Sequence, residues 1–121
     1  MDSGQYSRGI ALFNQAAFFA CHEVLEDAWR DAPGPERKFL QALIQTAVAF
    51  HHHSKGNLIG ARSLLERALR NLAAYPGEFA GLELTPLRQS IVGWQEALDK
   101  GTSTPSLPVL QLCPAGKLID H

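Results

Sequence analysis

The sequence has few of the features that identify disulfide-rich, zinc-binding, membrane-spanning or exported proteins. Its 121 residues include only two cysteines, Cys21 and Cys113, and their wide separation predicts neither a disulfide framework nor a zinc ribbon. No run of about 18 apolar residues is present for a membrane span. The first ten residues also lack the basic start and apolar stretch of an export signal. We therefore expect a cytoplasmic protein that does not associate with membranes.

Neither sign of charge dominates the chain. The chain contains 11 Lys and Arg residues and 12 Asp and Glu residues, which gives a formal net charge of -1. Binding to nucleic acid requires a clear excess of basic side chains on one face, so this balance argues against a nucleic-acid partner. With 45% hydrophobic residues, the chain is long enough to form one soluble domain over residues 1–121 and to bury roughly two-thirds of its unfolded surface.

Apolar residues recur with helical spacing, and Gly and Pro interrupt the pattern. The predicted helices cover about residues 6–13, 16–31, 36–55, 58–74 and 87–100. Short turns join the first helix to the second and the third to the fourth, which predicts two antiparallel hairpins in a compact all-α bundle. Residues 101–121 carry several prolines and alternating apolar residues, so we expect an extended C-terminal tail laid over the bundle.

The third predicted helix has an unusual composition. Its segment "FLQALIQTAVAFHHHS", residues 39–54, contains no charged side chain, which predicts a central helix covered on every side. The segment that follows reads as a structural turn. Gly56 suits the left-handed residue that closes a helix, and Asn57 is a natural N-cap for the next one. Gly60 and Ala61 would then allow two helix backbones to approach closely.

The segment "CHEVLEDAW", residues 21–29, places a histidine and three acids in the second predicted helix. Helical spacing separates them, because His22, Glu26 and Arg30 follow one another at i, i+4 and i+8 and form a row. This row borders a broad apolar arc, which we expect to be buried. The arc consists of Phe18, Cys21, Val24, Leu25, Ala28 and Trp29. A thiol in such an arc is inert, so Cys21 is not predicted to be catalytic.

Gln45 and His52 form a comparable row on the third predicted helix, at a spacing of two turns. If the two rows face each other, His22 and Glu26 meet Gln45 and His52 in a partly buried polar seam. Such a seam satisfies the hydrogen-bonding requirement of buried polar groups without performing any chemistry. The sequence does not fix how each helix is rotated about its axis, so the facing of the rows is an assumption.

Two functional interpretations compete with the structural one. In the first, Gln45, His52, Trp29 and Arg30 hold a small molecule or peptide between helices. In the second, His22, Glu26 and His52 bind a divalent metal in a metal-dependent or hydrolase-like enzyme. The order HExxE departs from the HExxH of helical zinc proteases, and the repeated ExxH of di-iron bundles is absent. We therefore expect no cofactor, with a divalent metal as the alternative.

Two segments, "LFNQAAFFACHEVLEDAWR" at 12–30 and "FLQALIQTAVAFHHHSKGNLIGARSLLERAL" at 39–69, closely resemble the domain of unknown function 309 family of small all-helical prokaryotic proteins. The resemblance covers roughly residues 5–100 and implies a compact helical bundle. It also implies that the positions characteristic of the family form one unit. It does not imply any particular reaction. These positions are Phe13, Asn14, His22, Glu23, Leu25, Glu26, Trp29, Gln45, His52, Gly56, Asn57, Gly60 and Ala61.

The sequence thus leaves the biochemical function unknown and favours a small binding or interaction protein over an enzyme. Its partner would be a small molecule or another protein. The apolar face near Trp94 and the segment "LPVLQL", residues 107–112, could cover the bundle itself or a second copy. We expect the former, which favours a monomer over a homodimer.

Overall fold

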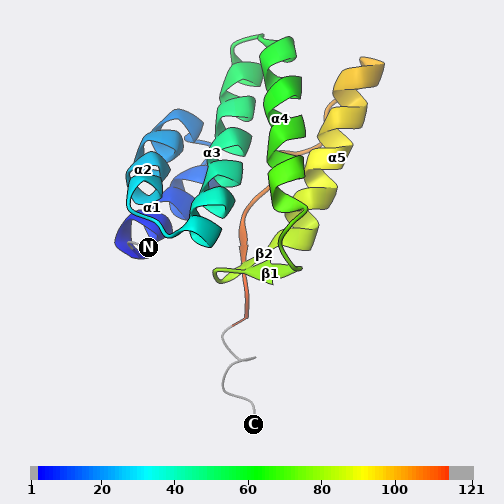
Figure 1. Ribbon diagram of the computed structural model, residues 1–121. Helices are drawn as coiled ribbons and strands as arrows, with labels where there is room; N and C mark the ends of the chain where they lie inside the picture. The colour runs from blue at the N-terminus through cyan, green and yellow to red at the C-terminus, as the bar shows by residue number, and fades with distance from the viewer. Residues whose placement is uncertain (1–2, 115–121) are drawn as a thin grey trace.

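The computed structural model describes residues 3–114 of the chain. It contains five helices and three two-residue strands (Figure 1). The helices are α1 (Ser3–Asn14), α2 (Phe18–Arg30), α3 (Gly34–Ser54), α4 (Leu58–Leu72) and α5 (Leu84–Lys100). The strands are β1 (Glu78–Phe79), β2 (Leu82–Glu83) and β3 (Gln111–Leu112). The predicted all-α bundle of five helices is therefore confirmed, and the small sheet is an addition to it.

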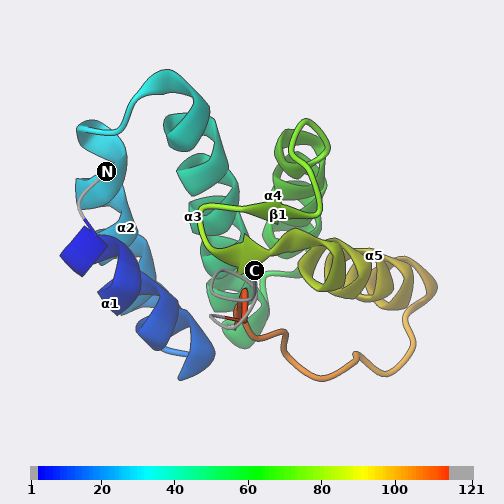
Figure 2. The ribbon, with the colours of Figure 1, turned by 90° about the horizontal axis from the view of Figure 1, so that it is seen from below.

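The helices pack as the turn lengths predict. Helices α1 and α2 form one antiparallel hairpin and α3 and α4 form another, while α5 packs against α4 (Figures 1 and 2). Helix α3 lies between α2 and α4, which confirms its central place. In the described part of the chain, no helix is both long enough and apolar enough to cross a membrane.

The turn between α3 and α4 has the predicted chemistry, and Gly60 has a role there that the sequence did not suggest. Gly56 has a φ of 81°, the left-handed conformation that closes α3, and Oδ1 of Asn57 accepts a hydrogen bond of 3.0 Å from the backbone N–H of Gly60. A Cβ atom on Gly60 would lie 2.6 Å from Nδ2 of Asn57. Gly60 therefore makes room for the capping side chain of its own helix.

Three helices, α1, α3 and α5, begin earlier than predicted, and in α3 and α5 a proline lies in the first turn. Helix α3 begins at Gly34 with Pro35 as its next residue, and α5 begins at Leu84 with Pro86 two residues later. The first turn of a helix tolerates proline, because the N–H groups there have no intrahelical acceptor. Both prolines therefore lie in the first turn of a helix that was predicted to begin after them.

The extended tail contributes to a small antiparallel sheet with strand order β1-β2-β3. Ala80 and Gly81 join β1 to β2, and both have positive φ, as a two-residue type I′ hairpin requires. Strand β3 lies in the tail and pairs with β2, so the tail returns to the bundle as predicted (Figure 2). Residues 115–121 of the predicted tail lie outside the described residues.

Aromatic side chains fill both ends of the core. At one end, Phe18 and Phe50 have ring centroids 5.4 Å apart, and Phe50 meets Trp94 edge-on at 4.9 Å. At the other end, Phe39 meets Phe79 at 5.0 Å and lies against Tyr6 and Tyr75 as well. Apart from the tilted pair of Phe18 and Phe50, these are edge-to-face contacts, which aromatic rings prefer and which add to the stabilisation from burial.

Helix α3 is not covered on every side, which corrects the expectation from its lack of charge. Phe39, Leu43 and Phe50 are buried, but Gln41 is exposed and Gln45 is half-buried. Uncharged polar side chains tolerate contact with water, so the absence of charge did not require complete coverage. The polar edge of α3 instead faces a hollow beside α4.

Candidate functional site

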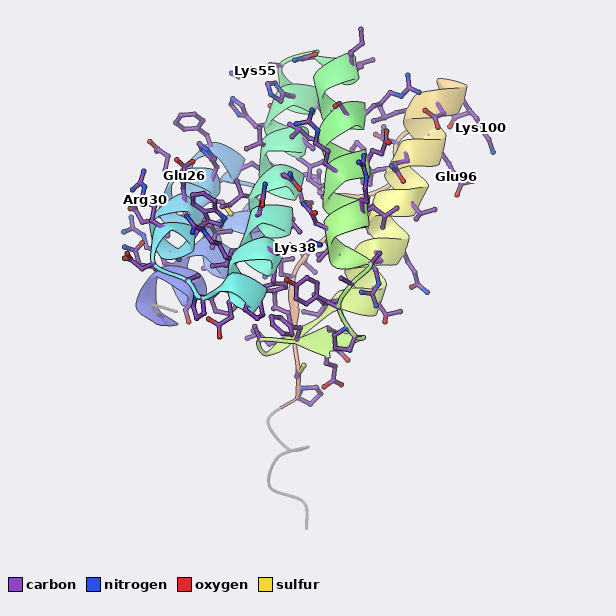
Figure 3. All side chains as sticks on the ribbon, in the orientation of Figure 1. Glu26, Arg30, Lys38, Lys55, Glu96 and Lys100 are labelled. Carbon is purple, nitrogen blue, oxygen red and sulfur yellow. The ribbon has the colours of Figure 1, made fainter. Side chains whose placement is uncertain are left out.

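The predicted row on α2 exists, and its ion pairs stay within that helix. Nε2 of His22 lies 2.8 Å from Oε2 of Glu26, and the guanidinium of Arg30 lies 3.6 Å from Oε1 of the same carboxylate. Arg30 also donates a hydrogen bond of 2.6 Å to Asp27. Figure 3 shows Glu26 and Arg30 on the outer side of α2. The row is thus a set of partly exposed i, i+3 and i, i+4 pairs, each of which contributes only a few tenths of a kcal/mol.

The imidazole of His22 is less exposed than the rest of the row. Its Nδ1 is buried and has no hydrogen-bond partner among the described residues. The exposed ring of Phe19 lies beside His22, at 5.8 Å between centroids, and also beside His51 of α3, at 5.4 Å. Phe19 thus links the two helices through ring contacts.

The two predicted rows do not form a common seam. Oε1 of Gln45 accepts a hydrogen bond of 2.9 Å from Nδ2 of Asn71 in α4, and Nδ1 of His52 lies 3.2 Å from the side-chain Nδ2 of Asn57. Across residues 3–114, no hydrogen bond or ion pair joins His22 or Glu26 to either residue. Helix α3 is rotated so that Gln45 faces α4 instead of α2. The spacing of the row was correct, and the assumed facing was wrong.

The other predicted arrangements are also separated in space. The indole of Trp29 stacks with the guanidinium of Arg37 at 4.1 Å, whereas Arg30 pairs with acids of its own helix. The predicted pocket of Gln45, His52, Trp29 and Arg30 is therefore not formed as one site. In the part of the chain that the structure describes, no three His, Cys, Asp or Glu side chains gather as metal ligands. The trio of His22, Glu26 and His52 is accordingly not assembled.

A different site lies where the end of α3, the middle of α5 and the tail meet. It is a groove of about 350 Å³. Its apolar walls are formed by Phe18, Phe50, Trp94, Pro105 and Leu107, and its polar groups include the imidazoles of His51 and His53. The ring of His53 meets that of Trp94 edge-on, with centroids 4.9 Å apart. The groove thus combines a deep aromatic wall with two side chains that can donate or accept hydrogen bonds.

The outer wall of this groove is a strap of tail residues, 104–109, that is fixed near both ends. The indole N–H of Trp94 donates a hydrogen bond of 3.1 Å to the carbonyl oxygen of Ser106. Asn14 binds both backbone groups of Leu110, because its Nδ2 donates to the carbonyl oxygen at 3.1 Å and its Oδ1 accepts from the N–H at 2.6 Å. Between these anchors, Leu107 and Val109 remain 44% and 51% exposed.

Sequence reasoning did not find this groove, because its walls come from segments far apart in the chain. Helical spacing separates the side chains of three consecutive histidines, but the partner of His53 could not be inferred from it. The nearest signal was Asn14, which follows the first predicted helix and is one of the positions of the family resemblance. A polar side chain that binds both backbone groups of one residue 96 positions away has no local sequence pattern.

The family comparison confirms the resemblance over a shorter span than predicted. Residues 6–64 match the model of a domain of unknown function, DUF309. This segment of the chain belongs to the DUF309 family. The predicted extent of roughly 5–100 is thus reduced to α1, α2, α3 and the first half of α4.

Two relatives of this chain carry no assigned activity. It is 41% identical over 58 residues to an uncharacterized protein, YpuF, of Bacillus subtilis (strain 168), which covers 47% of this chain and 33% of that protein. It is 30% identical over 88 residues to an uncharacterized protein of Aquifex aeolicus (strain VF5), with coverages of 69% and 26%. The matched region therefore spans about a third or less of these longer relatives.

The DUF309 segment contains part of the groove and all of the site residues predicted from the sequence. Phe18, Phe50, His51 and His53 lie within it, whereas Trp94 and the strap lie beyond its end. The groove is therefore completed by elements that follow the family segment.

Proposed function

We propose that this chain is a small-molecule binding module, and that its ligand carries an apolar ring or chain together with a hydrogen-bond acceptor. The observation that carries this proposal is the groove of about 350 Å³ between α3, α5 and the strap. Small-molecule sites typically enclose about 300–1,000 Å³ with mostly apolar walls and a few polar groups. Two other hollows, one beside His22, Glu26 and Arg30 on α2 and one between α3 and α4, measure about 240 and 280 Å³ and have mainly polar linings.

The chemistry of the walls defines the ligand class. Phe50 and Trp94 are each 2% exposed, so their rings are fixed in the core and form the floor of the groove, while Pro105 and Leu107 supply the exposed apolar surface. His51 and His53 provide N–H groups that can donate to a carboxylate, carbonyl or hydroxyl oxygen of the ligand. An apolar body contacts the rings, and its polar end meets the imidazoles.

The strap can contact this ligand without a large change in its own backbone conformation. Its anchors at Ser106 and Leu110 fix the backbone on both sides of Leu107. A ligand that enters a preformed groove loses less free energy to the ordering of side chains and loops. All walls of the groove come from one chain, so the proposal requires no second copy.

Benzoate is a suitable probe because it joins an aromatic ring to a carboxylate. In an NMR titration, we expect saturable shifts of the Trp94 indole N–H and of the backbone amides of residues 104–107. The indole N–H is a direct reporter, since it donates to Ser106 at the groove wall. The Leu107→Asp variant should weaken benzoate binding about tenfold or more, because it places a like charge in the groove.

Val109→Asp provides the matched control. Val109 lies on the same strap and is similarly exposed, but it does not line the groove. The control variant should retain the wild-type affinity within about twofold, because an exposed charge outside the site contributes little. Equal loss of binding in both variants, or shifts confined to the α2 row around His22, would refute the proposal.

A further inference from the structure

A second site, on the other side of α3, goes beyond the proposed function. The hollow between α3 and α4 has a volume of about 280 Å³ and is lined by Gln41, Gln45, Arg67, Arg70 and Asn71. Every one of these side chains ends in an amide or a guanidinium, and none is an acid. We propose that this hollow binds a phosphate group, either as a free anion or as part of a phosphorylated small molecule.

The backbone brings these head groups together in two facing rows. Gln41 and Gln45 are one turn apart on α3, and Arg67 and Asn71 are one turn apart on α4. The hydrogen bond of 2.9 Å from Asn71 Nδ2 to Gln45 Oε1 ties the rows together. This bond uses the acceptor oxygen of Gln45, so its Nε2 group remains a donor that can point toward a ligand.

The charge of the hollow is positive although that of the whole chain is not. Glu66 neutralises part of the charge of Arg70 through a pair of 3.2 Å, whereas Arg67 has no acidic partner among the described residues. Lys38 lies one turn before Gln41 on α3, and Figure 3 shows it at the seam between α3 and α4. Two guanidiniums and several amide donors therefore line one small volume, and an ammonium group lies nearby on α3.

A phosphate group fits this set better than the other candidates. A cation would be repelled by the arginines, and an apolar ligand would leave the amides unpaired. Guanidinium forks bind phosphate oxygens through two parallel hydrogen bonds, and a dianion matches the surplus of positive charge. A nucleic acid would need basic side chains spread over a much longer track than this local cluster provides.

Inorganic phosphate is the probe for the first test. In an NMR titration at constant ionic strength, phosphate should shift the side-chain amide signals of Gln41, Gln45 and Asn71 in a saturable way. Acetate and chloride should not do so at the same concentration. Glycerol phosphate in a parallel titration distinguishes the two sources, because tighter binding than that of free phosphate indicates a phosphorylated small molecule.

Arg67→Gln should weaken phosphate binding about tenfold, since it removes an unpaired guanidinium from the hollow. Arg62→Gln is the matched control, because it removes the same charge from the same helix but at a residue paired with Asp99 outside the hollow. Both side chains are exposed, so both variants should remain folded.

The proposal fails if the two variants weaken binding equally, which indicates general screening, or if phosphate produces no saturable shift. It also fails if duplex DNA binds this face with a steep salt dependence and phosphate alone does not. A negative result for benzoate at the groove leaves this test unaffected, because the two sites share none of their lining residues.

Discussion

At the scale of single residues, Gly9 decides how closely α1 and α2 can pack. A Cβ atom at this position would lie 2.7 Å from Cγ of Leu25, a side chain that is fully buried in α2. Leu25 has no free volume into which it can move, since it lies inside the hydrophobic core. The packing of this hairpin therefore depends on the absence of a side chain in α1.

The Gly9→Ala variant should be destabilised by about 1–3 kcal/mol, as expected for overpacking of a well-filled core. The midpoint and slope of urea unfolding measure this change. Gly34→Ala is the control, because a Cβ atom at Gly34 meets nothing within 4 Å. Gly34→Ala should leave the stability nearly unchanged, and a similar loss in both variants would exclude the close contact at Gly9 as the cause.

The helix cap at Asn57 and the row of His22, Glu26 and Arg30 could be predicted, because both follow from local spacing. The partner of Gln45 could not be predicted in the same way. A rotation of α3 by a fraction of a turn moves this amide from the α2 side to the α4 side without changing the periodicity. Local geometry was thus accessible from sequence, whereas the pairing of helix faces depended on packing.

At the scale of elements, the tail is the part whose structure depends most on distant contacts. Strand β3 has only two residues, both of them exposed, so burial of its own side chains does not hold it in place. Its position depends on pairing with β2, on the buried Leu110 and on the two hydrogen bonds of Asn14. A two-residue strand has no detectable sequence pattern, which explains why the sheet was not predicted.

Asn14→Ala should release the strap, because both backbone groups of Leu110 lose their side-chain partner. We expect a loss of about 1–3 kcal/mol in unfolding free energy and faster amide hydrogen exchange over residues 107–112. Gln15→Ala changes a neighbouring exposed residue and should leave exchange in the tail unchanged. Unaltered exchange of the Leu110 amide in Asn14→Ala would show that the sheet alone holds the tail.

At the scale of the whole molecule, the family segment and the described fold do not end at the same place. The DUF309 match ends at residue 64, inside α4, while the second half of this helix supplies the fully buried Leu65 and Leu72. Helix α5 and the tail then add Trp94 and Leu110 to the same core. In this chain, the elements after the matched segment are part of one hydrophobic core with it.

That core holds two groups that can lose a proton, and this links its stability to alkaline pH. Burial raises the pKa of the Cys21 thiol to about 12, from an ordinary value of 9.0. Burial also raises the pKa of Tyr6, and the nearby Cys113 raises it further. The folded protein therefore keeps protons that the unfolded chain has already lost. Unfolding releases protons in this range, so rising pH favours the unfolded state.

The free energy of unfolding should consequently fall as the pH rises above about 9, by up to about 1.4 kcal/mol per pH unit for each group that is ionised only in the unfolded chain. Cys21→Ala removes the thiol contribution and should delay the decline until the Tyr6 hydroxyl begins to ionise in the unfolded chain. The ordinary pKa of a tyrosine hydroxyl is 10.0. Urea unfolding at a series of alkaline pH values measures both slopes. Because the slopes are compared, any constant loss of stability from the smaller side chain cancels. Parallel curves for the two proteins between about pH 9 and 10 would show that Cys21 ionises equally in both states, which contradicts its burial.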